Sequence, residues 1–180
     1  MRILKEDAIG LIIDIQERLH PKIHDYGKLE ANTQILIRGL KALGVPMLVT
    51  QQYTKALGPT VQPVREALGE FEYHEKLSFS CCDTHDFAVD LENQGKNHVI
   101  MAGEETHVCV LQTTLDLLAL GYQPVVVEDC VSSRKANDKQ VALGRIRQAG
   151  GIITTCESVL FELTRFAGSD TFKQISRLVK

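Results

Sequence analysis

Short apolar runs alternate with segments of helical periodicity along the whole chain. Residues 8–13 are continuously apolar and rich in β-branched side chains, which is typical of a strand buried on both faces of a sheet. From residue 29 to residue 43 the apolar side chains recur at helical spacing, and Gly44 follows where a helix C-cap is expected. The chain therefore begins with a buried strand followed by an amphipathic helix.

The same alternation continues to the other end of the chain. Further strands are predicted over 46–49, 98–102, 124–127 and 152–154, with a weaker one at 71–74, and further helices over about 106–120, over 136–149 and from 169 onward. Strands that alternate with helices favour a mostly parallel sheet covered on both faces. We expect a three-layer, Rossmann-like α/β fold of about six strands in the order 3-2-1-4-5-6. Residues 51–69 read as one long irregular connection.

Length and composition indicate an ordinary globular protein. The 180 residues are 44% hydrophobic and 24% charged, which suits a single domain over 1–180 that needs no metal or disulfide to fold. The net charge of −3 removes the electrostatic argument for a nucleic-acid partner. No apolar run approaches the roughly 20 residues that span a membrane, and the first residues do not resemble a secretory signal. We therefore expect a cytoplasmic protein with no membrane partner.

The cysteines do not have the number or spacing of a disulfide framework or a metal site. There are five of them, at positions 81, 82, 109, 130 and 156, and neither their odd number nor their spacing suggests disulfides or a zinc site. Most are expected to be reduced and buried, because free cysteine packs as a small hydrophobe. Cys109 is the candidate exception, because it falls at the start of a predicted helix that follows a strand.

Asp14, Lys76 and Cys109 each come just after a predicted strand. Ligands of open parallel sheets bind outside the carboxyl ends of the strands, so these three side chains are candidates for one site. A free thiol has a pKa of about 8.5. If Thr106 caps the following helix, Cys109 lies in its first turn, where the helix dipole favours a thiolate. A lysine about 4 Å away adds on the order of 4 kcal/mol. Together these effects predict a thiol pKa below 7 and a nucleophile for acyl transfer.

Each of the three residues also has a purely structural interpretation. An aspartate after a strand is commonly a turn residue, a lysine near a strand end is commonly solvated, and a cysteine in an apolar helix is commonly core. A nucleotide-binding module is a further alternative, but it needs a glycine-rich loop after the first strand, and residues 14–18 read DIQER. A catalytically silent scaffold or small-molecule binding protein with the same fold remains open.

Three motifs resemble those of the isochorismatase-like cysteine hydrolases and occur in that family's order. They are LIIDIQ at 11–16, HEKLSFS at 74–80 and GEETHVCV at 103–110. TQQY at 50–53, LGPTV at 57–61 and DCVSSR at 129–134 resemble the isochorismatase domain-containing proteins more narrowly. The resemblance covers nearly the whole chain, and three motifs in order are specific where one alone is weak.

The resemblance implies a catalytic triad of Asp14, Lys76 and Cys109. Cys109 would be the nucleophile, Asp14 the proton shuttle, and Lys76 the cation that stabilises the thiolate and keeps Asp14 ionised. The family's oxyanion hole maps to the backbone N–H groups of Glu105 and Cys109. The family also has a cis peptide bond at the position of Glu104–Glu105, so we expect one there.

Differences between this sequence and the family pattern restrict which of the family's activities are expected. The nicotinamidase branch carries an Asp/His metal site after the second strand, but no histidine lies between His24 and His74, so no metal and no other cofactor is expected. A cysteine nucleophile points to hydrolysis of a C–N, amide-type bond in a small molecule. The candidate substrate-pocket residues are Gln16, Gln52, Tyr53, Phe79, Thr106 and His107. Family members commonly form homo-oligomers, and the same is expected here.

Overall fold

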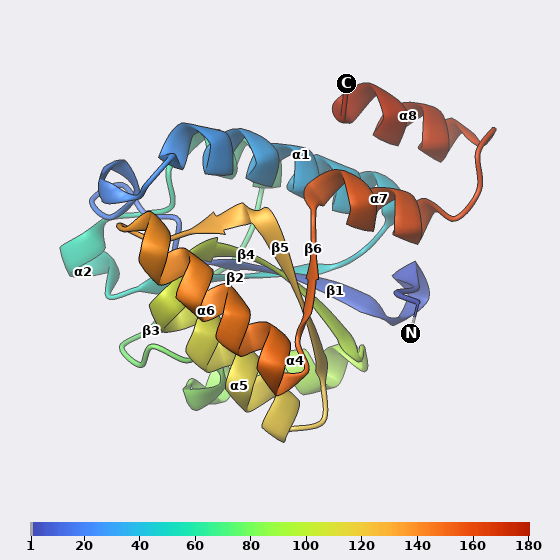
Figure 1. The fold of residues 1–180 in the computed structure, drawn as a ribbon. Coiled ribbons are helices and arrows are strands. Elements are labelled where there is room, and N and C mark those ends of the chain that lie inside the picture. The colour runs from blue at the N-terminus through green and yellow to red at the C-terminus, as the bar shows by residue number, and fades with distance from the viewer. Residues whose placement is uncertain (1) are drawn as a thin grey trace.

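The computed structural model describes residues 2–180 and contains a six-stranded parallel sheet with helices on both faces (Figure 1). The strand order is β3-β2-β1-β4-β5-β6 and every neighbouring pair is parallel, which confirms the predicted fold class. The strands are β1 (Ala8–Ile13), β2 (Met47–Gln52), β3 (His74–Lys76), β4 (His98–Glu104), β5 (Gln123–Ser132) and β6 (Ile152–Thr154).

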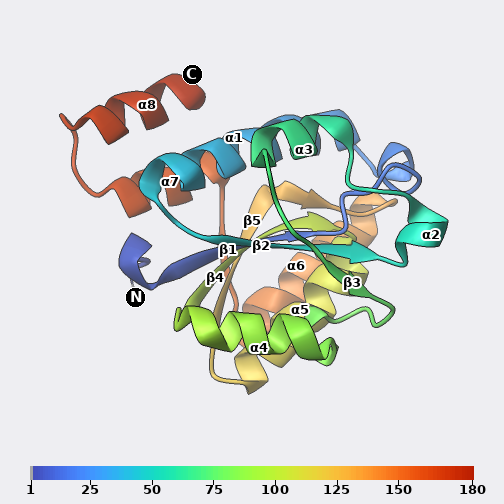
Figure 2. The same cartoon turned by 180° about the vertical axis from the view of Figure 1, so that it is seen from behind.

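Two helical layers enclose the sheet. One layer contains α1 (Tyr26–Leu43), α3 (Gln62–Leu68), α7 (Cys156–Thr164) and α8 (Asp170–Leu178); the other contains α4 (His85–Gln94), α5 (Leu111–Ala119) and α6 (Ala136–Ala149) (Figures 1 and 2). The short helix α2 (Thr54–Leu57) lies at the end of the sheet to which β1 points. In the described part of the chain, no helix has the length and apolar content needed to cross a membrane.

The strand β1 shows why a continuous apolar run is needed at the centre of the sheet. Ile9, Leu11 and Ile13 point to the face covered by α4, α5 and α6, whereas Ala8 and Ile12 point to the face covered by α1 and α3. All six residues are buried, because β1 pairs with β2 on one side and β4 on the other. The expectation of a strand buried on both faces is confirmed.

Two expectations about the elements are wrong, and two helices were not predicted. Residues 51–69 are not one irregular connection, because β2 extends to Gln52 and the helices α2 and α3 follow it. The weak strand lies at His74–Lys76 rather than 71–74, because the sheet edge pairs Thr50–Gln52 with these residues. The pattern analysis also did not identify α4 and α7. Each of these helices buries only a narrow apolar stripe, Phe87 and Leu91 in α4, for example.

Gly103 in β4 permits the closest backbone approach in the sheet. Its φ is +136°, and a Cβ built on it would lie 2.1 Å from the carbonyl oxygen of Ile13 on β1. Gly103→Ala therefore forces β1 and β4 apart where both strands reach the candidate site. We expect this substitution to lower the free energy of unfolding by more than about 2 kcal/mol, measured by urea denaturation.

The matched control for this substitution is Gly144→Ala in α6. A Cβ at Gly144 meets no atom within 4 Å, and alanine favours a helix interior over glycine by up to about 1 kcal/mol. We expect Gly144→Ala to leave stability unchanged or to raise it. A Gly103→Ala protein as stable as the wild type would contradict the strand packing described here.

Candidate active site

The three candidate catalytic side chains meet at the carboxyl end of the sheet. Asp14 directly follows β1, Lys76 is the last residue of β3, and Cys109 lies in a π-helical turn, Thr106–Val110, that follows β4 and leads into α5. From β1 the sheet continues through β2 and β3 on one side and through β4, β5 and β6 on the other. The site is thus at the point where the strand order reverses, the usual ligand position in such sheets.

Asp14 and Lys76 form a buried ion pair. Lys76 Nζ lies 2.6 Å from Asp14 Oδ2, and neither side chain is exposed to solvent. The other carboxylate oxygen, Asp14 Oδ1, accepts a hydrogen bond of 2.7 Å from the hydroxyl of Thr50 on β2. Asp14 has a φ of +53°, a left-handed conformation that aspartate tolerates better than most residues. The backbone therefore turns at Asp14, and its side chain is fixed between two strands.

Lys76 also connects Asp14 to the thiol. Its Nζ lies 3.6 Å from Cys109 Sγ. The remaining hydrogen bonds of the ammonium group go to oxygen acceptors around it, the side chain of Gln52 and the main-chain carbonyls of Ser78 and Phe79. One buried cation thus contacts both the carboxylate and the sulfur, and the surrounding acceptors hold it in place.

The resting thiol is not acidified, contrary to the sequence-based expectation. Burial and then the charge of Asp14 raise the pKa of Cys109 above its ordinary value, and the nearby Lys76 lowers it by less. The expectation considered the helix dipole and the lysine but left out the cost of burying a thiolate beside a carboxylate. At neutral pH Cys109 is therefore a thiol. It needs a base to become a nucleophile, and Asp14 is the carboxylate beside the same lysine.

The ionisation of Asp14 gives a pH prediction. Burial raises the pKa of Asp14 above 3.8, and Lys76 and Thr50 only partly offset this. If Asp14 is the base that accepts the thiol proton, it must be ionised, and activity should fall as the pH falls through this raised pKa. We expect the acid limb of kcat/KM against pH to lie above pH 3.8. Thr50→Val removes a hydrogen bond that lowers the pKa, so it should move the limb to higher pH; a limb that moves the other way would contradict this role.

Two glutamines organise the wall beside the triad. Gln16 is fully buried; its side-chain amide donates to the carbonyl oxygens of Gln52 and Gly58, and its Oε1 accepts from the Gln52 N–H at 2.7 Å. Gln16 therefore ties the segment after β1 to the end of β2. Gln52 in turn accepts from Lys76 at 2.6 Å. Gln52 therefore contacts Lys76 directly and Gln16 holds Gln52 in place, whereas neighbouring Tyr53 is 46% exposed.

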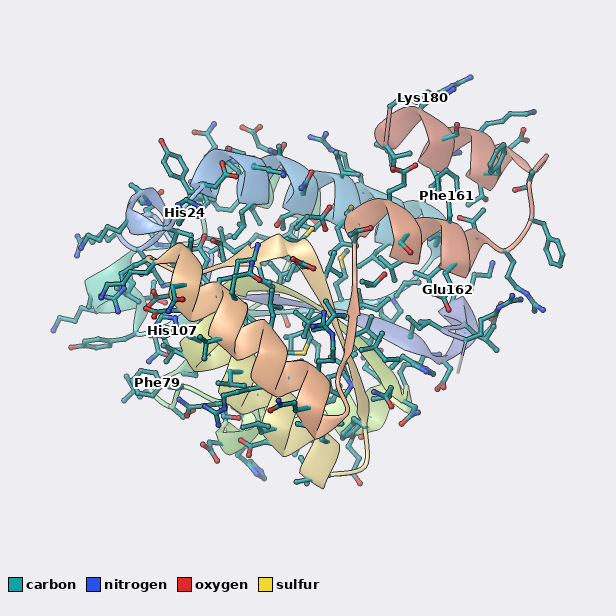
Figure 3. The ribbon with its side chains drawn as sticks, in the orientation of Figure 1. His24, Phe79, His107, Phe161, Glu162 and Lys180 are labelled. Carbon is teal, nitrogen blue, oxygen red and sulfur yellow. The ribbon has the colours of Figure 1, made fainter. Side chains whose placement is uncertain are left out.

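The other candidate pocket residues occupy different environments. Phe79 is 53% exposed, and Figure 3 shows Phe79 and His107 on the same side of the molecule. His107 lies 2.9 Å from the Ser133 hydroxyl through Nδ1. Thr106 is buried and does not cap the helix as expected, because Glu105 is the N-cap residue. Thr106 starts the helical turn, and its hydroxyl has no hydrogen-bond partner among residues 2–180.

The segment before Cys109 is held by two ion pairs. The Glu104–Glu105 peptide bond is cis, at the bond where the family resemblance places one. Glu104 is completely buried, and its Oε1 lies 2.5 Å from His20 Nδ1. Glu105 accepts from Arg134 Nε at 2.9 Å and from the Arg134 N–H at 3.1 Å. The two side chains on either side of this peptide bond are therefore both anchored.

Sequence reasoning missed several residues of the site. Thr50, His20 and Arg134 were not identified, although Thr50 and Arg134 fall within stretches that resemble the family. Parallel register provides the one signal for Thr50, since it pairs with Ile13 beside Asp14. His20 lies outside the regular elements of the pattern, so its partner in β4 was not predictable from periodicity.

The remaining cysteines have structural environments. Cys81, Cys130 and Cys156 are buried and Cys82 is half-buried, and the structure records all of them as free thiols. Burial raises the pKa of Cys81 to about 12 and that of Cys82 to about 11. Among residues 2–180 there is no cluster of three or more His, Cys, Asp or Glu side chains arranged to hold a metal ion.

Fold and site together define an α/β protein with a buried cysteine, lysine and aspartate at the switch point of a parallel sheet. The Isochorismatase domain family model matches residues 8–158, and this chain belongs to the isochorismatase family. It is 37% identical to isochorismatase domain-containing protein 2A of Mus musculus, over 99% of this chain and 85% of that protein. It is 39% identical to isochorismatase domain-containing protein 1 of Salmo salar, over 93% of this chain but only 59% of that protein.

Solved structures show the same architecture. A structure described as MAR1 ribonuclease from Caenorhabditis elegans superposes with a TM-score of 0.94 at 35% identity, covering 99% of this chain and 92% of that one. The ycaC gene product of Escherichia coli, described as an octameric hydrolase of unknown specificity, gives a TM-score of 0.92 at 25% identity, over 99% and 90% of the two chains. The chain therefore has an isochorismatase-family hydrolase fold.

Proposed function

We propose that this chain is a cysteine hydrolase that cleaves a C–N, amide-type bond of a small molecule through an acyl-enzyme on Cys109. The observation that carries the proposal is the position of Lys76 Nζ, 2.6 Å from Asp14 and 3.6 Å from Cys109 within a buried site. A lysine with a structural role alone would not require both a thiol and a carboxylate next to its ammonium group. A buried ion pair also costs free energy of folding unless hydrogen bonds satisfy both charged groups. Membership of the isochorismatase family supports the same conclusion.

The first half of the reaction forms the acyl-enzyme. Cys109 Sγ attacks the carbonyl carbon of the substrate while Asp14 accepts the thiol proton, and the C=O π electrons move onto oxygen. Backbone N–H groups of Glu105 and Cys109 donate to this oxyanion, a contribution of roughly 3–4 kcal/mol for each donor. The C–N bond then breaks, and Asp14 gives its proton to the departing amine. The product of this half is a thioester on Cys109.

The second half restores the thiol. Water attacks the thioester carbonyl, Asp14 accepts a proton from the water, and the C–S bond breaks as the tetrahedral oxyanion collapses. The Cys109 sulfur then takes up the proton held by Asp14, and the carboxylic acid product leaves. Lys76 stays protonated throughout because the charges of Asp14 and Cys109 raise its pKa more than burial lowers it. No step in this scheme requires a metal ion.

Hydrolysis of RNA is the main competing activity, because the C. elegans structure is described as a ribonuclease. The net charge of −3 offers no general attraction for a polyanion. A buried thiol and carboxylate are also better suited to an acyl carbon than to a phosphodiester of RNA. We therefore favour a small-molecule substrate, with RNA included as a test compound. A catalytically silent scaffold remains the alternative of a different class.

The proposed function is tested with a panel of small amides, ureido compounds, esters and an RNA oligonucleotide, each with and without EDTA. We expect hydrolysis of at least one amide-type compound that is unchanged by EDTA. Mass spectrometry of the quenched reaction should show the acyl group on the peptide that contains Cys109. Turnover of RNA alone, or loss of all activity in EDTA, would overturn the proposal. No turnover and no acyl adduct with any compound would favour the silent scaffold.

The chain is also proposed to form a homo-oligomer. The E. coli relative is described as octameric. In this chain Tyr53, Leu77 and Phe79 leave large apolar side chains exposed on the segments that follow β2 and β3, with Leu77 73% exposed. A second copy that covers these segments would shield the acyl-enzyme from bulk water. Catalysis also needs a reduced thiol, which a cytoplasmic location would maintain.

A further inference from the structure

A second buried ion pair lies behind the proposed oxyanion hole. His20, in the short turn His20–Lys22 after β1, approaches Glu104 at the end of β4 with 2.5 Å between Nδ1 and Oε1. Glu104 is completely buried, and His20 is only 3% exposed. The peptide bond that follows Glu104 carries the N–H of Glu105, one of the two proposed oxyanion donors. The pair therefore adjoins the reacting centre without belonging to the triad.

The surroundings of this pair are mostly acidic. On the other side of the ring, Glu30 of α1 lies 3.3 Å from His20 Nε2, and Tyr26 packs edge-on against the ring. The carboxylates of Glu105 and Asp14 act on Glu104 through their charge. Glu104 Oε2 has no hydrogen-bond partner in the described part of the chain. Within this group, His20 is the charge that offsets Glu104.

We propose that His20 and Glu104 act as a positioning pair for the oxyanion hole, and that a proton held by the pair keeps negative charge away from the developing oxyanion. This inference rests on the proposed function. With the proton in place, the pair is electrically neutral as a unit and fixes the end of β4 that carries the Glu105 N–H. When the proton is lost, Glu104 is a bare carboxylate beside the place where the substrate oxygen becomes negative.

The direction of the pH effect follows from the groups that face the pair. Burial lowers the pKa of His20, but Glu104 and Glu30 raise it by more, so its net pKa is above 6.5. Burial raises the pKa of Glu104, His20 partly offsets this, and Glu105 and Asp14 raise it further. The pair therefore holds its proton to a higher pH than a free histidine does, and loses it as the pH rises further. Burial lowers the pKa of Lys76, but Asp14 and Cys109 raise it by more, so Lys76 is not the group that titrates first.

The test combines three variants with a pH profile of kcat. We expect the wild type to lose kcat on the alkaline side. His20→Gln removes one of the two sites for the proton, so the loss should start at a lower pH than in the wild type and reduce kcat roughly tenfold on the alkaline side. Glu104→Gln removes the charge itself and should abolish this alkaline loss. The double variant should behave like Glu104→Gln, and KM should change little because the oxyanion forms only in the transition state.

His98 provides the matched control. It is the first residue of β4, is 3% exposed, and lies 3.1 Å from Asp7 Oδ2, so it is a comparable histidine–carboxylate pair at the opposite end of the same strand. His98→Gln should keep the wild-type pH profile. The inference would be overturned if the pH profile of kcat were unchanged in both His20→Gln and Glu104→Gln. It would also be overturned if the double variant lost as much kcat at alkaline pH as His20→Gln. A pair with a structural role alone would give additive losses of kcat without a shifted pH limb.

An aldehyde probe separates this inference from the proposed function. Isotopically labelled acetaldehyde should add to Cys109: the S–C bond forms, the C=O π electrons move onto the oxygen, and the thiol proton passes to Asp14, so that an oxyanion occupies the hole. Adduct affinity, measured by NMR, should follow the same pH pattern in the variants. If Cys109 forms the adduct but the variants match the wild type, only the positioning role fails. If the wild type forms no adduct and hydrolyses no compound, the proposed function fails and the positioning role with it.

Discussion

Replacing Cys109 with alanine is expected to lower kcat toward the preferred amide by at least about 10⁴-fold. The reason is chemical: Asp14 and Lys76 would remain in place, but no other nucleophile would be available. The Sγ atom of Cys81 lies 3.9 Å from the hydroxyl oxygen of Thr50, and Cys81 makes no hydrogen bond to Lys76. The residual rate would come from water activated by Asp14 and from binding alone. The measurement is steady-state hydrolysis, with thermal unfolding to show that the variant is folded.

Cys82→Ala is the matched control for this substitution. Cys82 is half-buried, and its backbone N–H donates a hydrogen bond of 3.3 Å to the hydroxyl of Ser80. We expect this variant to keep kcat within about twofold of the wild type, because the Cys82 thiol has no hydrogen bond to Asp14, Lys76 or Cys109. If Cys109→Ala retained more than a tenth of the activity, the acyl-enzyme mechanism would be wrong.

Lys76→Met should have the largest effect on stability. The substitution removes the cation from a fully buried pair and leaves Asp14 as a buried carboxylate with no countercharge, hydrogen-bonded to the Thr50 hydroxyl and the Cys109 thiol. Breaking a buried pair from one side costs about 3–5 kcal/mol, so we expect a loss of that size in the free energy of unfolding by urea denaturation at neutral pH. Activity should also be lost, because the thiolate formed during attack would have no countercharge.

The double variant Asp14→Asn with Lys76→Met tests the physical cause. Removing both charges eliminates the unpaired carboxylate, so stability should return to within about 2 kcal/mol of the wild type while activity stays absent. The deficit of the single variant should also shrink as the pH falls through the raised pKa of Asp14, since a protonated Asp14 needs no partner. A double variant no more stable than Lys76→Met would show that lost packing of the lysine chain, and not the charge, is responsible.

The sequence predicted the scaffold well because β1 and its neighbours obey one strong rule. A strand buried on both faces is apolar at nearly every position, so residues 8–13 and 98–102, in which only His98 is polar, are recognisable from the sequence. The shift of the edge strand from 71–74 to His74–Lys76 shows the opposite case. An edge strand is specified by its pairing with β2, and three residues carry too little periodicity to show it.

The site was predictable in its members but not in its electrostatics. Asp14, Lys76 and Cys109 stand at strand ends, and parallel strands bring their carboxyl ends to one edge, so their meeting follows from topology. The state of the thiol does not follow. It depends on how completely Cys109 is buried and on which charge dominates there, and both are properties of packing. The contact between His20 and Glu104 was also missed, because 84 positions separate these two residues in the chain.

The candidate catalytic residues and the most exposed residues near them belong to different parts of the chain, which makes this protein a practical starting point for directed evolution. Asp14, Lys76 and Cys109 lie buried at or just beyond strand ends, whereas Tyr53, Leu77 and Phe79 are exposed side chains on connecting segments. A randomised library confined to these three positions would vary which substrates fit while leaving the Lys76 contacts and the packing of β1 against β4 intact. Selection for a new substrate should enrich changes there before any in the strands.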